Sequence, residues 1–396
     1  MKPSRLLICL ASLALVSACS RIIPDGQPQQ PLPVAPNAAS LGIAAGASFS
    51  SLPVSNIDAS NALDAFASSC LVVQTRQDVS GLTRLEDWAA PCDAATSWPR
   101  DDARRFFAGY FTPAVVGDGQ GFATGYFEPQ ISGSRTRRPG FDVPVYAVPQ
   151  DLERCWRDDT PISQREGRAP LSRRTPAGDC VSYYSRAEIK DGALSGRGLE
   201  IGWAADPVEF FFLQIQGSGQ LIAPDGQVTR IGYAGQNGKS YTGIGALMRE
   251  RGLLGDGPGQ YAGSMQGIMQ YIRDNPAAGA ALMRENESWV FFRVLEGAGP
   301  IGSIGVPVSA ENSVAVDPNF VPYGAPVFLD LDRDVADGMW VAQDTGGAIK
   351  GANRFDTFWG AGTRAREVAG GMSGRGPALI LLPREAAERL GLRHRP

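Results

Sequence analysis

Two aspartates lie close together in the most polar and glycine-rich part of this 396-residue sequence. Asp344 precedes a Gly-Gly pair and Lys350, and Asp356 follows between aromatic residues in the segment RFDTFWG, 354–360. Apolar neighbours disfavour a charged carboxylate and raise its pKa, which suits a general acid that protonates a leaving oxygen. Aromatic faces also suit sugar rings, so the pattern favours glycoside cleavage, although hydrolases of this kind normally need a second carboxylate.

Two other interpretations of these aspartates compete with glycoside cleavage. Asp-Thr-Gly at 344–346 is also the aspartic-protease tripeptide, but that chemistry needs two carboxylates that share a proton, and the sequence has no second copy. In the structural interpretation, Asp344 accepts backbone hydrogen bonds in its glycine turn, and Asp356 caps a helix that begins at Thr357.

The only histidine is His394, which lies between two arginines near the C-terminus. Ser-His-Asp and Cys-His catalysis both need a positioned imidazole, and the helical zinc motif needs two. A terminal histidine is poorly suited to these roles, so we expect no metal site and look to carboxylates, a lysine or a tyrosine. The chain carries 37 basic and 41 acidic residues without a basic block, which argues against a nucleic-acid partner.

The N-terminus has the features of a bacterial export signal. Lys2 and Arg5 precede an apolar stretch, 6–16, that is too short to span a bilayer comfortably. Small residues before Cys19 resemble the lipoprotein cleavage site, which predicts removal of 1–18 and lipidation of Cys19; the alternative is an ordinary secretory signal cut nearby. Ser20 then favours the periplasmic face of the outer membrane. Residues 19–49 are rich in proline and predict an extended tether, with the folded part beginning near Ser50.

Four cysteines lie beyond the signal region. Pairing between sequence neighbours would join Cys70 to Cys92 and Cys155 to Cys180, although four cysteines allow three connectivities. Export to an oxidising periplasm favours disulfides. None of these cysteines has the spacing of a zinc site.

The elements that must position the aspartates are mainly β-strands. Alternating or apolar runs between turns predict strands at 143–148, 211–216, 227–235, 289–295, 325–331, 339–343 and 377–383. Helices are predicted at 62–74, 101–111, 244–252, 264–272 and from Pro276 to about Asn286. Little helix lies between the C-terminal strands, so a β-barrel or sandwich is favoured over alternating β-α units.

Several motifs in the same order closely resemble the MltA family of peptidoglycan-cleaving lytic transglycosylases. They are TGYFEP (124–129), FFLQIQGSG (211–219), 286–292, VAVDP (314–318) and the segment from Asp344 to Asp356. The resemblance runs from about 121 to 383. It implies a mainly β fold, with a double-psi β-barrel split in sequence (50–129 plus 285–396). A second, β-barrel-like domain, 130–284, would be inserted in it and form the other wall of a glycan groove.

The resemblance also implies a reaction that needs only one carboxyl group. The recurrent aspartates of the family fall on Asp317, Asp344 and Asp356, and its single catalytic acid falls on Asp356. This acid would protonate the β-1,4 oxygen between N-acetylmuramic acid and N-acetylglucosamine, and would then accept the proton of the muramic C6 hydroxyl as that group attacks C1. The product is a 1,6-anhydromuramoyl end, formed by an exo-acting lyase without a cofactor. An intramolecular nucleophile supplies the proximity advantage that a second carboxylate would otherwise provide.

Asp344 would be a helper that orients its loop or Lys350, or stabilises developing positive charge. The matching motifs supply the glycan-binding candidates Thr124, Tyr126, Gln214, Gln216, Ser218, Tyr241 and Lys350. Gln214 and Gln216 alternate with apolar residues on the predicted strand, which fits a glycan contact or a water-facing side equally. Glu128 lies in a matched motif, but the resemblance gives it no catalytic role.

The expected partners are peptidoglycan glycan strands, the membrane through the lipid anchor, and peptidoglycan synthases. Two other functions stay open: a glycan hydrolase that uses the Asp344 and Asp356 pair, and a non-catalytic peptidoglycan-binding lipoprotein. The residues themselves do not distinguish endo- from exo-action.

Overall fold

The computed structural model describes residues 35–297 and 299–392. The signal sequence, Cys19 and His394 therefore lie outside the described residues. The described residues from Pro36 onward form one compact unit. No described helix combines the length and the apolar character needed to cross a membrane.

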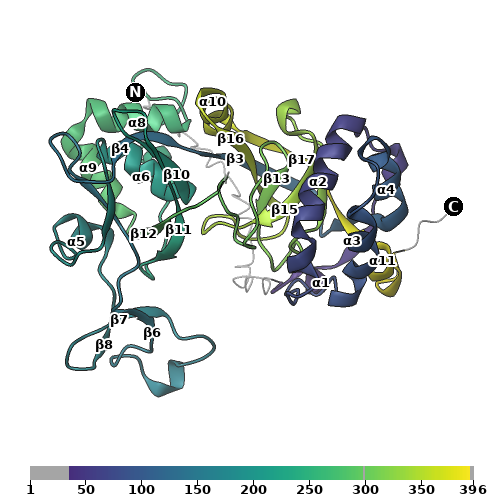
Figure 1. Ribbon diagram of the computed structural model, residues 1–396, viewed down its shortest axis with the longest axis horizontal. Helices are drawn as coiled ribbons and strands as arrows, with labels where there is room; N and C mark the ends of the chain where they lie inside the picture. Colours follow the sequence, from purple (N-terminus) through teal and green to yellow (C-terminus); the bar gives the residue numbers. More distant parts are fainter. Residues whose placement is uncertain (1–34, 298, 393–396) are drawn as a thin grey trace, which may run out of the picture. The chain divides into compact units, whose positions relative to one another are not determined.

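The larger sheet has eight strands in the order β1-β2-β17-β14-β15-β13-β16-β3. β17 also pairs with β3, so the strands from β17 round to β3 form a closed ring of six (Figure 1). β3 precedes the insert and the other five follow it, which confirms the expected barrel built from two separate parts of the sequence. The strands are β1 (Ile43–Ala45), β2 (Phe111–Val116), β3 (Gln120–Glu128), β13 (Ser313–Val316), β14 (Pro326–Leu329), β15 (Gly338–Asp344), β16 (Arg354–Ala361) and β17 (Ser373–Pro383).

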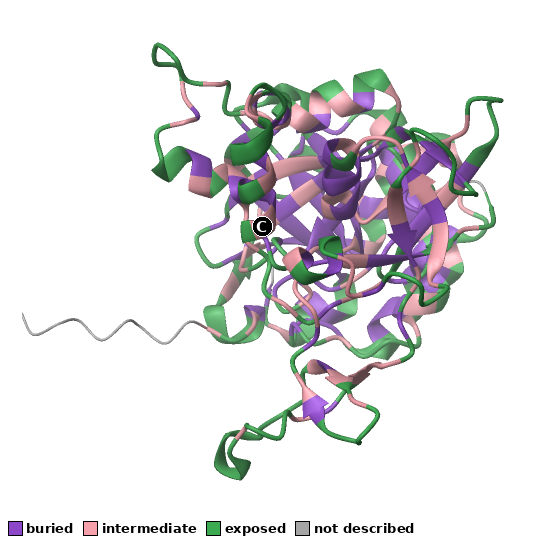
Figure 2. Ribbon diagram, turned by 90° about the vertical axis from the view of Figure 1, so that its left-hand side faces the viewer, coloured by how far each residue is buried: buried purple, intermediate pink, exposed green. Residues whose placement is uncertain are grey.

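Helices pack against the barrel and contribute apolar side chains to its buried core (Figure 2). They are α1 (Ala38–Leu41), α2 (Asn56–Val73), α3 (Ala89–Ala95), α4 (Ala103–Tyr110), α10 (Thr363–Gly371) and α11 (Arg384–Arg389). α2 begins where the Ser55 side chain accepts the Asp58 N–H, and its buried face packs on β15. A disulfide joins Cys70 of α2 to Cys92 of α3.

The folded part begins earlier than the sequence indicated. Ala38 is fully buried, and β1 pairs with the edge of β2, with Ile43 opposite Val116. Because these backbone hydrogen bonds extend the barrel sheet, residues 38–45 are not part of an extended tether.

The insert is built around a six-stranded sheet in the order β12-β11-β10-β4-β9-β5, whose edge strands β12 and β5 also contact each other. Its strands are β4 (Gln130–Ser134), β5 (Val143–Tyr146), β9 (Glu200–Ala204), β10 (Ser218–Ile222), β11 (Val228–Gln236) and β12 (Val290–Val294). Its helices are α5 (Arg186–Lys190), α6 (Pro207–Gln216), α7 (Ile244–Glu250), α8 (Met265–Asp274) and α9 (Pro276–Glu285). The expected end at residue 284 is too early, because β12 pairs with β11 and so belongs to this sheet.

A small sheet, β6-β7-β8, forms a separate part of the insert that the sequence did not predict (Figure 1). Its strands are β6 (Leu152–Arg154), β7 (Leu171–Arg174) and β8 (Cys180–Val181). The second disulfide joins Cys155 to Cys180 across it. Short 3-10 helices lie at η1 (Phe49–Ser51), η2 (Leu85–Trp88), η3 (Arg100–Asp102), η4 (Ile162–Gln164) and η5 (Asp334–Ala336).

The strand predicted at 211–216 is wrong, because this segment is the second half of α6. Asp206 caps the helix by accepting two backbone N–H groups, Pro207 occupies its first turn, and Gly217 ends it in the left-handed conformation. The helix lies between two apolar clusters, with Phe210 in one and Phe211 in the other. Because it is buried on several sides, the sequence lacks the one-sided apolar pattern that identifies a surface helix.

Candidate active site

A row of paired residues crosses the barrel sheet at the centre of the site. Asp344 and Asp356 both pair with Ala315, from opposite sides, and Asp356 also pairs with Thr124 of β3. Residues directly opposite each other on neighbouring strands project to the same face of a sheet, so these side chains share one face. Neighbouring strands lie about 4.8 Å apart, which places the Cα atoms of the two aspartates about 10 Å from each other.

The aromatic residues around Asp356 divide between the two faces of β16. Phe358 shares the face of Asp356, and its ring centroid lies 4.9 Å from that of Tyr126. Phe355 and Trp359 point the other way, into the barrel core. The expectation that aromatic walls flank Asp356 on both sides is therefore wrong in part, because strand alternation leaves only Phe358 on its face. The helix-cap interpretation is also wrong, because Asp356 lies inside a strand.

Asp356 is a half-buried carboxyl group with one hydrogen-bond donor among the described residues. Thr124 Oγ1 donates to Asp356 Oδ1 at 2.5 Å. Burial raises the pKa of Asp356 to about 6; Thr124 and the positive Arg354 oppose this rise, and the negative Asp344 adds to it. A carboxyl group with this pKa can both give and take a proton near neutral pH.

Asp344 is held by three donors and so differs from Asp356. Its Oδ1 accepts the backbone N–H groups of Ser303 at 2.9 Å and Thr345 at 2.8 Å, and its Oδ2 accepts the hydroxyl of Tyr126 at 3.0 Å. Burial raises the pKa of Asp344, while these hydrogen bonds oppose the rise. Both carboxylate oxygens are therefore engaged in holding the loop at Ser303 and the ring of Tyr126.

The loop between the two aspartates is fixed by residues at its ends. Asp317 is buried, and its Oδ2 accepts the backbone N–H of Gly351 at 2.8 Å. Asn353 has a left-handed φ of 53° and donates its side-chain amide to Val116 O at 2.9 Å, which sets the start of β16. Lys350 is exposed in this loop and forms no ion pair with any described residue. Asp344 is thus oriented by contacts other than Lys350.

The insert contributes the remaining candidates from α6, β10 and a loop. Gln216 Oε1 accepts the backbone N–H of Phe127 at 2.9 Å, which ties the end of α6 to β3. Gln214 is only 2% exposed and is occupied inside the insert, since it accepts from Arg186 Nη1 and donates to Val290 O. Ser218 is half-buried at the start of β10.

Tyr241 lies within electrostatic range of the acid. Burial raises the pKa of its hydroxyl, the negative charge of Asp356 raises it further, and Arg186 opposes both. Its side chain is also partly exposed. Glu128 is buried, and each of its carboxylate oxygens accepts a hydrogen bond, one from Arg230 and the other from Gln220. These contacts indicate a structural role.

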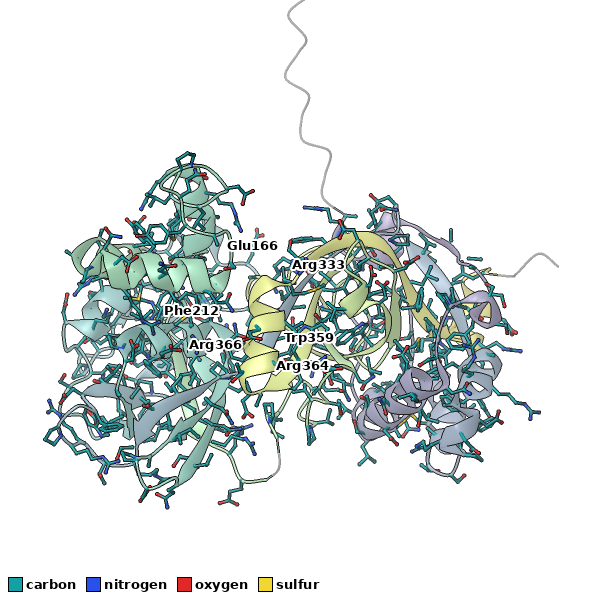
Figure 3. All side chains as sticks on the ribbon, turned by 90° about the horizontal axis from the view of Figure 1, so that it is seen from above. Glu166, Phe212, Arg333, Trp359, Arg364 and Arg366 are labelled. Atoms are coloured by element: carbon teal, nitrogen blue, oxygen red, sulfur yellow. A yellow bond between two sulfur atoms is a disulfide. The ribbon has the colours of Figure 1, made fainter. Side chains whose placement is uncertain are left out.

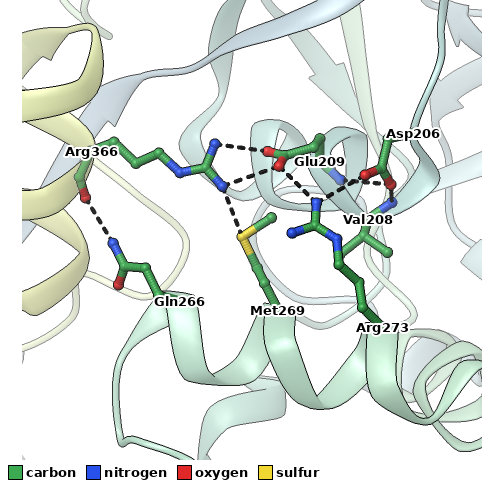
Figure 4. A network of polar contacts seen from close by, with 7 residues as sticks. All are labelled: Asp206, Val208, Glu209, Gln266, Met269, Arg273 and Arg366. Atoms are coloured by element: carbon green, nitrogen blue, oxygen red, sulfur yellow. Dashed lines mark hydrogen bonds and ion pairs between the residues drawn. The ribbon is translucent and has the colours of Figure 1, made fainter.

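Charged residues connect the barrel to the insert beside this site. α10 follows the strand of Asp356, and its Arg366 contacts Glu209 of α6 at 3.1 Å, while Arg273 of α8 contacts the same carboxylate at 2.8 Å (Figure 4). Gln266 of α8 donates to the backbone oxygen of Arg366. Figure 3 shows Arg366 on the insert side of α10 and Trp359 on the barrel side.

Sequence reasoning missed two parts of the site. Arg354 donates to the hydroxyl of Thr124, and Ser303 donates to Asp344. Arg354 could have been found, since it lies two residues before Asp356 on the same strand and so on the same face. Ser303 carries no local signal, because a distant loop brings it to Asp344.

Comparison with known proteins identifies two segments of the chain. The family model of the MltA-specific insert domain matches residues 122–293, and that of the 3D domain matches residues 312–382. A membrane-bound lytic murein transglycosylase A from Vibrio cholerae is 36% identical over 47% of this chain. That match spans 52%, or about half, of the relative's own length.

Solved structures extend the similarity over most of the chain. A membrane-bound lytic murein transglycosylase from Agrobacterium tumefaciens is 31% identical, with a TM-score of 0.77, and the match covers 88% of this chain and 99% of that one. Escherichia coli MltA with bound chitohexaose is 26% identical, with a TM-score of 0.58, over 81% of this chain and 89% of that one. The chain therefore belongs to the MltA family of membrane-bound lytic murein transglycosylases.

Proposed function

We propose that this protein is a lytic transglycosylase that cleaves the β-1,4 bond between N-acetylmuramic acid and N-acetylglucosamine and leaves 1,6-anhydromuramoyl ends. The observation that carries this proposal is Asp356, a half-buried carboxyl group on β16 that accepts a hydrogen bond from Thr124 and whose pKa desolvation raises to about 6. Family membership supports the substrate class, and the related Escherichia coli protein binds a sugar chain, chitohexaose.

Asp356 acts first as the acid. With a pKa of about 6, about a tenth of the molecules carry the proton at pH 7, and most carry it below pH 5. The proton moves to the bridging oxygen as the bond from that oxygen to C1 of the muramic acid breaks. The C6 hydroxyl of the same sugar then bonds to C1, and its proton returns to Asp356, so no water is consumed.

Asp344 is unsuited to activate a water molecule in this arrangement. Its two oxygens already accept hydrogen bonds from Ser303, Thr345 and Tyr126. A hydrolase would need a second carboxylate free to act as base or nucleophile. We therefore assign Asp344 to holding its loop and Tyr126, with the substrate supplying the nucleophile.

The glycan contacts belong to the same proposal. Tyr241 and Lys350 are the most exposed of the candidates, so they suit direct contact with sugar. Tyr126 offers its ring on the face of Asp356. Thr124 lies opposite Asp356, and Gln216 and Ser218 lie where α6 ends and β10 begins. Gln214 is buried in the insert, where it accepts a hydrogen bond from Arg186.

The proposal places the enzyme on the periplasmic face of the outer membrane, where a lipid on Cys19 anchors it. Peptidoglycan synthases are the partners to test there by co-purification. The sequence before Cys19 supports this location. Replacement of Cys19 with Ser should release the protein from the membrane fraction and abolish labelling by a fatty-acid analogue. Continued labelling in the variant would contradict the assignment.

The reaction is tested with purified glycan strands. Asp356→Asn should lower the rate of muropeptide release by about 10²–10⁴-fold, the usual contribution of general acid catalysis. Asp256→Asn is a matched control, because Asp256 is an exposed aspartate that forms no ion pair with any described residue, and the variant should cleave like the wild type. A protein that binds strands but releases nothing would be a binding lipoprotein, and full activity in Asp356→Asn would refute the proposal.

A further inference from the structure

Arg354, Thr124 and Asp356 form a chain of hydrogen bonds that ends on the catalytic candidate. Arg354 Nη2 donates to Thr124 Oγ1 at 2.9 Å, and Thr124 Oγ1 donates to Asp356 Oδ1 at 2.5 Å. Thr124 is directly opposite Asp356 on the neighbouring parallel strand, and Arg354 lies two residues before Asp356. Strand geometry therefore brings all three side chains to one face.

The guanidinium group of Arg354 is fixed by contacts other than Thr124. Its carbon lies 4.9 Å from the centroid of the Phe122 ring, and Nη1 donates to the backbone oxygen of Phe355. A planar guanidinium that packs on a ring and donates from two nitrogens has little freedom to turn. Its donor to Thr124 is thus held in place before any substrate binds.

The direction of each hydrogen bond follows from the chemistry of the groups. Arg donates only, whereas a threonine hydroxyl has one proton and accepts at its lone pairs. Because Arg354 occupies a lone pair of Thr124, the hydroxyl proton is free to point toward Asp356 Oδ1. Among the described residues, the Thr124 hydroxyl has no other acceptor for this proton.

We propose that Arg354 and Thr124 are positioning residues that keep Oδ1 of Asp356 as a hydrogen-bond acceptor, so that the proton given to the glycosidic oxygen is carried by Oδ2. This inference deepens the proposed function, since it rests on Asp356 as the acid. After the proton has left, the hydrogen bond from Thr124 becomes charge-assisted and stabilises the carboxylate until it accepts the proton of the C6 hydroxyl.

The other described titratable groups near Asp356 do not donate a hydrogen bond to it. Asp344 acts on it through charge, and Tyr126 directs its hydroxyl to Asp344 Oδ2. Tyr241, from the insert, interacts with Asp356 through charge and forms no hydrogen bond with it. Among the described residues, Thr124 is thus the hydrogen-bond donor to the acid.

The test measures the pKa of Asp356 by NMR titration of ¹³C-labelled carboxyl groups, with the resonance assigned by its loss in Asp356→Asn. Thr124→Val keeps the shape of the side chain and removes the donor, so the pKa should rise by about one unit or more. Thr124→Ser keeps a hydroxyl and should stay within a few tenths of the wild type. A fall in the pKa of Thr124→Val would overturn the proposal, because it would mean that Thr124 accepts a proton from the neutral acid.

The role of Arg354 is tested by combining variants. Arg354→Met should raise the pKa of Asp356 in the wild-type background and raise it by less when Thr124 is already Val, because only the direct effect of its charge is left. Equal shifts in both backgrounds would refute an action through Thr124. The comparison of Thr124→Val with Thr124→Ser tests the hydrogen bond from Thr124 to Asp356 even when Arg354→Met fails to fold.

The pH dependence of cleavage provides a second readout. In Thr124→Val the alkaline limb of kcat should move to higher pH with the pKa of Asp356, whereas a purely structural role would lower the rate at every pH. The titration needs no substrate, so the hydrogen-bond chain can be confirmed or refuted separately from the reaction. If Asp356→Asn stays active while the titration behaves as expected, the proposed function is refuted and the hydrogen-bond chain from Arg354 through Thr124 to Asp356 is confirmed.

Discussion

Replacement of the acid should make the protein more stable at neutral pH while it removes activity. The pKa of Asp356 is raised from 3.8 to about 6, chiefly by burial, so the folded state holds a proton more tightly than the unfolded state. The favourable contribution of the neutral acid is fully present below pH 3.8. It declines as the pH rises toward 6 and is lost above that value.

The size of the effect follows from the shift in pKa. A rise of about 2.2 units corresponds to about 3 kcal/mol at 1.36 kcal/mol per unit. Asp356→Asn replaces the carboxylate with a neutral group of similar shape. We therefore expect the variant to be about 3 kcal/mol more stable than the wild type at pH 8, and to differ little at pH 4.

Urea unfolding followed by tryptophan fluorescence, from pH 4 to pH 8, measures this difference. Asp58→Asn is the matched control, because burial also raises the pKa of Asp58 to about 6, although it lies on α2 and accepts a backbone N–H from Met339. It should show a similar pH-dependent gain while cleavage is retained. An Asp356→Asn variant that is no more stable than the wild type at pH 8 would refute the raised pKa, and with it the physical basis for the acid.

Three further perturbations address the surroundings of the site. Tyr126→Phe removes a donor to the half-buried Asp344 and should cost about 1.5–3 kcal/mol in urea unfolding at pH 7; an unchanged midpoint would contradict that hydrogen bond. Replacing both Cys155 and Cys180 with Ala should destabilise the β6-β7-β8 sheet by about 3 kcal/mol, seen as faster hydrogen exchange there, with cleavage retained; loss of cleavage would show that this sheet serves the site. Arg366→Gln should lower the melting temperature at low salt and approach the wild type at high salt, because its ion pair is about one-third exposed; an equal loss at both salt levels would argue for packing instead.

Three of the six ring strands, β14, β15 and β17, could be predicted from the sequence, because they are short apolar runs between turns, whereas β3, β13 and β16 were not predicted. The run at 377–383 became the second half of β17, and the run at 339–343 lies within β15. The pairing of β17 with β3 that closes the ring joins residues far apart in the chain. No local pattern encodes such a pairing, so the strand pattern favoured a barrel or a sandwich equally, and only the family resemblance chose the barrel.

The sequence motifs singled out residues that the structure brings together, but they did not reveal the geometry of these residues. Asp356 and Thr124, both singled out by the matched motifs, are hydrogen-bonded to each other. The sequence predicted a strand around Gln214, because the segment is apolar on several sides. The segment is instead part of α6, which buries Gln214 against Arg186. The aromatic segment around Asp356 predicted a raised pKa, and the pKa is raised. The stated reason was partly wrong, because strand alternation turns Phe355 into the barrel core and desolvation of the whole group causes the rise.

The most direct test of the proposed reaction is the fate of water. Purified glycan strands are digested in H₂¹⁸O, and the masses of the new ends are measured. A lytic transglycosylase should yield 1,6-anhydromuramoyl ends that are lighter than reducing ends by one water and contain no ¹⁸O. Reducing ends that carry ¹⁸O would show hydrolysis, and would contradict a mechanism in which Asp356 works with the C6 hydroxyl of the substrate.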